Sequence, residues 1–138
     1  MKTIIQLICN ISLLVLPFSG NTQLDSVSVE LQSENYQYLN ELNDSTIGTC
    51  IKVDTWINDF DFFGEILITA YDIETNFPVD MNKFTKSQVI SKEMLNENVI
   101  TTRVCNSIES GRTYRIDVQV RDYQGMNFAL KQEMIEVD

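Results

Sequence analysis

The sequence predicts an all-β domain, built as a single antiparallel β-sandwich of about seven short strands. In residues 114–121 every second side chain is apolar, and the side chains between them are charged or carry an amide. This period of two is typical of a strand with one buried and one solvated face. Turn-forming residues separate several further short apolar stretches, and no long segment has a convincing helical period. Together these observations favour two packed sheets.

Composition and charge limit the classes of function. The 138-residue chain has 20 Asp and Glu against 10 Lys and Arg, so that phosphate backbones and anionic membranes would repel it. It has no His, which removes Ser-His-Asp and Cys-His catalytic groups and the commonest zinc ligand. We therefore predict no enzymatic activity, no catalytic residues, no cofactor and no binding to nucleic acid.

Residues 1–23 are predicted to be a secretory signal peptide. Lys2 provides the positive charge, residues 4–16 form the apolar segment, and Pro17 precedes small residues suited to cleavage. An apolar segment of about 13 residues is short of the roughly 20 that a spanning helix needs. We expect a mature domain over residues 24–138 with a net charge of −11, located outside the cell or in the periplasm, and not stably inserted in a membrane.

The expected strands follow from apolar alternation between turn signals. They cover residues 25–32, 47–57, 62–73, 99–105, 114–122 and 126–137, with a short edge strand at 88–90 and a possible short strand at 36–39. In residues 47–57 the side chains expected to face inward are Ile47, Ile51, Val53 and Ile57. Residues 62–73 are apolar on both faces, so the second face is either covered by the following loop or open to a partner. In residues 126–137 the apolar face shifts, which indicates a bulge.

The segment that begins at Ile108 resembles a known structural corner. Ile108, Gly111 and Tyr114 have the spacing of an apolar residue, a turn glycine and a strand-opening tyrosine. This resembles the E–F corner and F strand of fibronectin type III and related immunoglobulin-like domains. The resemblance implies an immunoglobulin-like sandwich in which the Tyr114 hydroxyl bonds back to upstream backbone. Trp56 departs from the family pattern, because it is out of phase with the inward residues of its strand.

Two cysteines remain once Cys9 leaves with the signal peptide. An even pair in an oxidising compartment favours a disulfide between Cys50 and Cys105. Both point away from the predicted core, and in immunoglobulin-like topology their strands are neighbours. We therefore expect a bridge between adjacent strands on the outer surface; two free thiols are the alternative.

Loops at one end of such a sandwich carry aromatic and short polar side chains, which recognition loops commonly use. The candidate binding residues are Trp56, Asp59, Phe60, Asp61, Phe62, Tyr123, Gln124 and Met126. The alternative is that the phenylalanines of residues 60–63 close the open end of the core. A weaker hypothesis places Ca²⁺ between Asp59, Asp61 and Asp122. The charged face of residues 115–121 is interpreted as solvated.

These observations favour a small exported interaction module, adhesive, receptor-like or part of an assembly. It would bind a protein partner, or a second copy of itself, through the end loops or an edge strand. One alternative is a carbohydrate-binding module that uses Trp56 and nearby aromatic residues. Another is an accessory subunit of a bacterial envelope or secretion complex.

Overall fold

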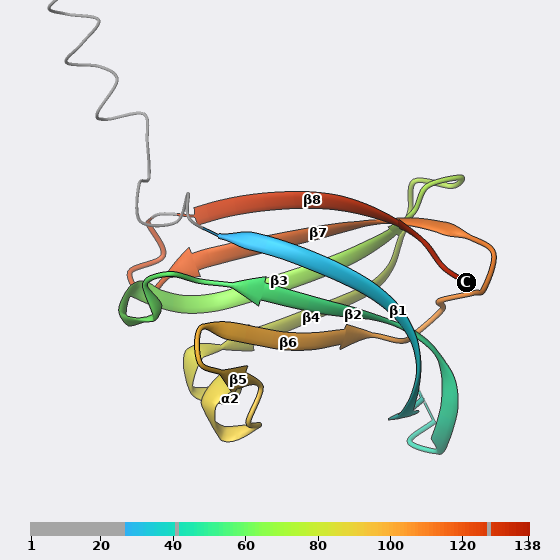
Figure 1. The fold of residues 1–138 in the computed structure, drawn as a ribbon, viewed down its shortest axis with the longest axis horizontal. Coiled ribbons are helices and arrows are strands. Elements are labelled where there is room, and N and C mark those ends of the chain that lie inside the picture. Colours follow the sequence, from blue (N-terminus) through green and yellow to red (C-terminus); the bar gives the residue numbers. More distant parts are fainter. Residues whose placement is uncertain (1–26, 41, 127) are drawn as a thin grey trace, which may run out of the picture.

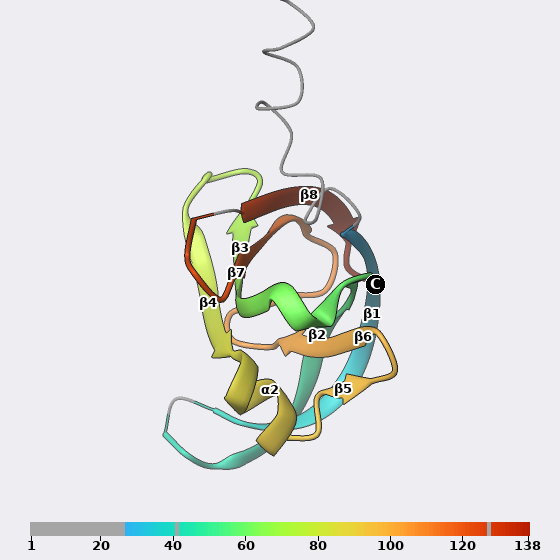
Figure 2. The same ribbon diagram turned by 90° about the vertical axis from the view of Figure 1, so that its left-hand side faces the viewer.

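The computed structural model describes residues 27–40, 42–126 and 128–138, and the predicted signal peptide lies outside these residues. Two four-stranded antiparallel sheets pack against each other around one core (Figures 1 and 2). The elements are β1 (Ser28–Leu39), β2 (Ser45–Trp56), η1 (Phe60–Phe62), β3 (Phe63–Asp72), β4 (Pro78–Thr85), α2 (Lys86–Ser91), β5 (Leu95–Asn96), β6 (Val99–Val104), β7 (Thr113–Asp122) and β8 (Phe128–Glu136). The predicted all-β class is confirmed, with eight strands in the described part of the chain.

The strand order places distant segments side by side. The first sheet has the order β1-β2-β6-β5, and the second has the order β4-β3-β7-β8. Strands β2 and β3 follow each other in sequence but belong to different sheets, so that the chain crosses from one layer to the other through residues 57–62. As a result, the end of β2, the start of β3 and the end of β7 meet at one end of the sandwich.

The core contains the residues that the alternation predicted. Tyr114, Ile116, Val118 and Val120 of β7 are all fully buried. They lie beside inward residues of β3, such as Ile68 opposite Val118, and belong to one cluster with residues of the first sheet. Each fully buried aliphatic side chain of this kind stabilises the fold by roughly 1.5–3 kcal/mol.

Three local predictions are wrong. The break expected between a strand at 25–32 and a short strand at 36–39 does not occur. Residues 28–39 form one continuous strand, because all of them pair with β2. Residues 88–90 lie in helix α2, not in an edge strand: the Thr85 side chain accepts a hydrogen bond from the Gln88 backbone, and the Gln88 side chain accepts one from the Thr85 backbone. This reciprocal pair is a capping box, which stabilises a helix start.

The third wrong prediction is the bulge expected in residues 126–137. Strand β8 pairs with β7 in an unbroken register from Thr113–Glu136 to Arg121–Phe128. Regular pairing keeps Ala129 and Val137 buried, and it leaves Leu130 and Met134 exposed on the outer face of the second sheet. The second apolar face of β3 lies on this same outer face, where Leu67 and Tyr71 are half-buried and the Arg115 guanidinium lies 4.4 Å from the centre of the Tyr71 ring.

The corner before β7 forms as its resemblance to immunoglobulin-like domains implied. The Tyr114 hydroxyl accepts a hydrogen bond from the Glu109 backbone N–H at 2.8 Å and donates one to the Ser107 carbonyl at 3.3 Å. Gly111 adopts a φ of 82°, which a side chain would disfavour, and its N–H donates to the Val137 carbonyl. Burial of the Tyr114 ring raises the pKa of its hydroxyl above the usual value of 10.0.

A salt-bridge group lies beside this corner. The Asp72 carboxylate, opposite Tyr114 on β3, accepts hydrogen bonds from the Glu74 backbone N–H and from Arg112. Arg112 also contacts Glu109. These partners favour the charged carboxylate, so that the pKa of Asp72 is lowered, chiefly by the Glu74 N–H.

Cys50 and Cys105 form the predicted disulfide, with 4.3 Å between their Cα atoms. The bridge lies next to the Ile51–Val104 pair, because Cys50 precedes Ile51 in the sequence and Cys105 follows Val104. It therefore joins adjacent strands as expected. It lies on the face of the first sheet that points away from the core, yet Cys50 is fully buried and Cys105 nearly so. The expectation of a surface bridge is therefore correct for the face and wrong for the exposure.

In the described part of the chain, no helix has the length and apolar character needed to cross a membrane.

Candidate binding groove at one end of the sandwich

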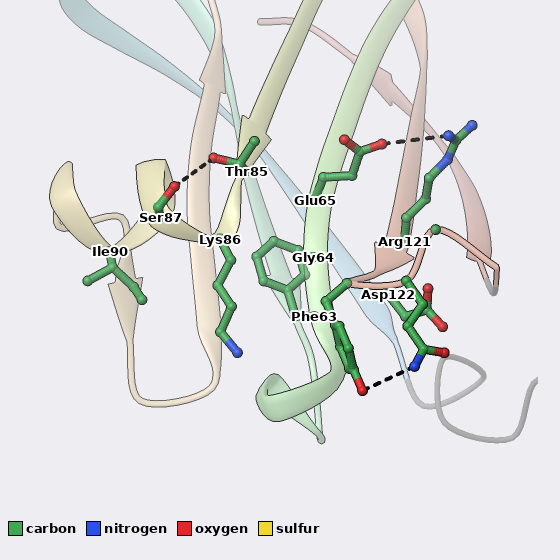
Figure 3. A pocket seen from close by; sticks show the side chains of 12 residues that line it. Phe63, Gly64, Glu65, Thr85, Lys86, Ser87, Ile90, Arg121 and Asp122 are labelled. Atoms are coloured by element: carbon green, nitrogen blue, oxygen red, sulfur yellow. Dashed lines mark hydrogen bonds and ion pairs between the residues drawn. The ribbon is translucent and has the colours of Figure 1, made fainter.

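An open groove of about 650 Å³ lies at the end of the sandwich where the chain crosses between sheets (Figure 3). One wall comes from the end of β4 and from α2, the floor from the start of β3, and the other wall from the end of β7 and the turn after it. The lining residues are Phe63, Gly64, Glu65, Thr85, Lys86, Ser87, Ile90, Arg121, Asp122, Tyr123, Gln124 and Gly125. A volume of this size is within the range of ligand-binding sites in proteins.

The floor depends on a glycine. A Cβ atom at Gly64 would lie 2.5 Å from the Asp122 carbonyl oxygen and 2.6 Å from the Tyr123 Cα. Only a residue without a side chain lets β3 and β7 approach this closely, and the register between them shifts at the same place, between Phe63 and Glu65. The Tyr123 N–H then donates to the Phe62 carbonyl at 2.9 Å, which fixes the start of the turn after β7.

The aromatic residues of the crossing segment divide into two roles. Phe63 is fully buried, and Phe60 packs against the core with its ring 5.3 Å from that of Phe63. These two side chains close the end of the core, as one alternative predicted. Phe62 lies outside that pair, 6.4 Å from the ring of Tyr123, which is 62% exposed. Tyr123 therefore presents an aromatic surface to the solvent.

Lys86 joins the helix wall to the crossing segment. Its Nζ donates hydrogen bonds to the Phe60 carbonyl at 3.0 Å and to the Asp61 carbonyl at 3.2 Å. The same ammonium lies 4.8 Å from the centre of the Phe60 ring, a distance that gives a cation–π attraction. These contacts hold α2 against η1, so that this wall of the groove is formed before any ligand binds.

The turn after β7 is organised by its own residues. The Asp122 carboxylate accepts a hydrogen bond from the Met126 N–H at 3.0 Å, and the Asp122 carbonyl accepts one from the Gly125 N–H. Gly125 has a φ of 70°, which suits a residue without a side chain. Among residues 27–40, 42–126 and 128–138, no three His, Cys, Asp or Glu side chains group as a metal site, so Asp59, Asp61 and Asp122 are not assembled to hold Ca²⁺.

Charges of both signs border the groove. Glu65 lies 3.0 Å from Lys83 and 3.7 Å from Arg121, measured between the charged nitrogen and oxygen atoms. Its negative charge is thus shared between two bases, while Lys86 adds a third base on the helix wall. With Asp122, the lining holds two acids and two bases, so its charges balance on a chain with a net charge of −10.

The structure brings together part of the predicted site. Tyr123 and Gln124 line the groove, Phe60 and Phe62 support its walls, and Met126 is 77% exposed in the adjoining turn. Asp59 precedes η1 and Asp61 lies within it. Trp56 does not line the groove: it lies at the end of β2, paired with Ser28 and Val99, on the outer face of the first sheet.

Sequence reasoning missed the helix wall. Thr85, Lys86, Ser87 and Ile90 lie in a region for which the sequence predicted only a short edge strand, at residues 88–90. The signal that could have found it is the Thr85–Gln88 spacing, which is typical of a capping box. That Ile90 is exposed beside a groove could not be inferred without the fold.

Comparisons with family models, with curated proteins and with solved structures gave no significant match to this chain.

Proposed function

We propose that this protein is a small exported, non-enzymatic interaction module of the immunoglobulin-like or fibronectin type III-like class, and that it binds a protein partner in the groove. The strand order and the hydrogen-bonded Tyr114 corner support the class. The observation that carries the function is a groove with fixed walls that exposes two apolar side chains, Ile90 and Tyr123, to solvent.

A partner protein suits this arrangement better than a small polar ligand. Aromatic and aliphatic side chains at the centre of a site, with charges at its rim, are typical of protein interfaces. Here Tyr123 and Ile90 are the apolar centre, and Lys86, Arg121 and Glu65 are the charged rim. The walls are braced by Lys86 and Gly64, so that a partner would not have to order them on binding.

A carbohydrate platform gains no comparable support. Trp56 lies away from the groove lining, and the ring of Phe60 is held between Phe63 and the Lys86 ammonium. A flat stack of aromatic rings open to a sugar would require different placements. An accessory role in a larger complex uses the same groove and is therefore included in the proposal.

The test uses three forms of the mature protein. Wild type, Tyr123→Ala combined with Ile90→Asp, and Met134→Asp are immobilised and exposed to extracts of the native host, and bound proteins are identified by mass spectrometry. Met134 is 60% exposed on the outer face of the second sheet, so it is a matched surface control. We expect one partner to be retained by wild type and by the control and lost by the groove variant. A partner retained by the groove variant would contradict the proposal.

A further inference from the structure

A two-stranded arm extends from the end of the sandwich opposite the groove. Residues 34–39 of β1 form it with residues 45–50 of β2. Strand β6 pairs with β2 only from Ile51 to Trp56, so within the described part of the chain no third strand continues beside β2 into the arm. Figure 1 shows the arm at the lower right, bending away from β8, whereas α2 lies at the lower left.

One side of the arm is an open strand edge. Strand β1 is the outermost strand of its sheet, and its 12 residues pair with β2 in one unbroken register. The backbone N–H and C=O groups on the far side of residues 35–39 therefore have no strand beside them among the described residues. A regular edge of this kind is a template for the addition of another strand.

This edge lacks the features that usually protect an outermost strand, which are charged side chains, proline and bulges. Residues 35–40 include no proline and no charged residue, in a chain in which 22% of the residues are charged. The preceding acid, Glu34, is paired with Arg103. The other outermost strands differ, because β4 begins at Pro78, β8 contains Lys131 and β5 is only two residues long. The edge of the arm is thus the one best suited to pairing.

The tyrosine rings of the arm leave this edge accessible. The Tyr36 ring lies over Arg103 of β6, with 4.0 Å between the ring centre and the guanidinium carbon. The Tyr38 ring lies at Gly48 of β2, 3.1 Å from the position that a Cβ atom would occupy there. Both rings therefore extend across β2 and away from the open edge of β1.

The arm has little support of its own. Leu39 and Ile47 have the phase of the core residues of their strands, yet they are 65% and 74% exposed, so the described residues form no second layer over them. A two-stranded ribbon is marginally stable in water, and three or more strands are needed for independent stability. A further strand at the open edge would therefore stabilise the arm.

A second copy of the chain offers a strand that suits this edge. Two identical strands that pair about a two-fold axis bring each side chain opposite a symmetry mate, so charged residues at the edge would repel each other. Residues 35–39 are uncharged and avoid this repulsion, although the whole chain has a net charge of −10. A different protein would place no such restriction on charge, because it can carry the opposite sign.

The free stretch also sets the register of such a pair. Antiparallel pairing centred on Gln37 uses all of residues 35–39 and places Asn35 opposite Leu39 of the second copy. Because side chains alternate between the two faces of a strand, this register keeps the inner faces of both arms on the same side.

We propose that two copies of this chain pair through the open edges of their arms, with the two-fold axis at Gln37. The two arms then form one antiparallel ribbon of four strands, in which the two copies of β1 are central and hydrogen-bonded to each other. The same edge is used on both copies, so the contact closes as a dimer. The inference goes beyond the proposed function, because the groove lies at the other end of the sandwich and stays open in the dimer.

The test measures self-association of the mature protein by sedimentation velocity across a range of concentrations. The variants are Gln37→Glu and Gln37→Lys, each of which places like charges opposite each other at the two-fold axis, and Gln32→Glu as the control on the same strand. Both glutamines are exposed, so circular dichroism should show an unchanged fold. We expect wild type and the control to form a dimer as the concentration rises, and each Gln37 variant to dimerise at least about fivefold more weakly.

Mixing the two Gln37 variants is the decisive step. In a mixed dimer a carboxylate lies opposite an ammonium group, so an equimolar mixture should dimerise more strongly than either variant alone. The mixture also controls for the hydrogen bond that Gln37 donates to Ser45 within the arm, because both variants lose it. A wild type that stays monomeric at all concentrations would overturn the inference, as would Gln37 variants that dimerise like wild type or a mixture no stronger than its components.

The groove variant separates this inference from the proposed function. Tyr123→Ala combined with Ile90→Asp leaves the arm intact and should dimerise like wild type. If that variant loses self-association, the copies meet through the groove and the edge pairing is wrong. If wild type is monomeric but the groove variant loses a captured partner, the proposed function stands and only the edge pairing fails.

Discussion

Two features at the same end of the sandwich differ in what holds them. One is the corner at residues 107–114, and the other is the two-stranded arm that residues 34–39 of β1 form with residues 45–50 of β2. In the corner, Tyr114 is fully buried and its hydroxyl bonds to two backbone groups. In the arm, Ile47 and Leu39 follow the core phase but remain exposed. The apolar residues of the corner are buried and stabilise the fold, whereas those of the arm are exposed to solvent.

Strand length explains the difference. Strand β2 continues past the end of β6, so Ile51 is covered by the opposite sheet and Ile47, four residues earlier on the same face, is not. The disulfide lies at the boundary, since Cys50 is the last residue of the arm and is joined to the end of β6 through Cys105.

Removing the disulfide should have the largest effect. The bridge closes a loop with a sequence separation of 55 residues, and in the chain-entropy model the Cys50→Ala, Cys105→Ala double variant loses about 4 kcal/mol of unfolding free energy. Urea unfolding of the two forms measures the difference. Hydrogen exchange should also show faster exchange in the arm than in β7. A loss below about 1 kcal/mol would mean that the boundary is held mainly by the strand pairing.

Tyr114→Phe should cost about 2 kcal/mol. The ring still fills its buried site, but the Glu109 N–H loses its acceptor and the Ser107 carbonyl loses its donor. Urea unfolding measures the change, and Tyr123→Phe, at an exposed position, is the matched control. An equal effect of the two substitutions would contradict the role of the corner.

Acid should weaken the corner through Asp72. Its pKa is lowered in the folded protein by the Glu74 N–H and by Arg112, so the carboxylate stabilises the fold above its ordinary value of 3.8. That stability is lost as the pH falls through the lowered value. Asp72→Asn should therefore reduce the difference in unfolding midpoint between neutral pH and about pH 3, as followed by circular dichroism. An unchanged pH dependence would contradict the assignment.

Ile47→Ala should have the smallest effect, within about 0.5 kcal/mol, because the side chain is already exposed. Ile51→Ala is its control on the same strand and face, and should cost about 2–5 kcal/mol, since it leaves a cavity in the core. Urea unfolding measures both. Comparable losses would show that the arm is covered in solution and would remove the contrast with the corner.

Several parts of this protein could be predicted because they depend on local patterns of residues. Alternation in residues 114–121 identified the central strand, and the spacing of Ile108, Gly111 and Tyr114 identified the corner by its resemblance to immunoglobulin-like domains. The number and position of cysteines indicated the Cys50–Cys105 pair. These features could be predicted because they repeat every second residue or involve residues a few positions apart, where backbone geometry restricts the outcome.

Which apolar residues are covered, and where the groove lies, depends on how the strands pack in three dimensions. The alternation in β2 is the same at Ile47 and Ile51, yet the length of β6 leaves one exposed and the other buried. The groove is lined by residues 63–65, 85–90 and 121–125, which meet because Gly64 lets β3 approach β7 and Lys86 holds α2 to η1. Contacts between segments this far apart depend on strand order and register, which no local pattern of residues specifies.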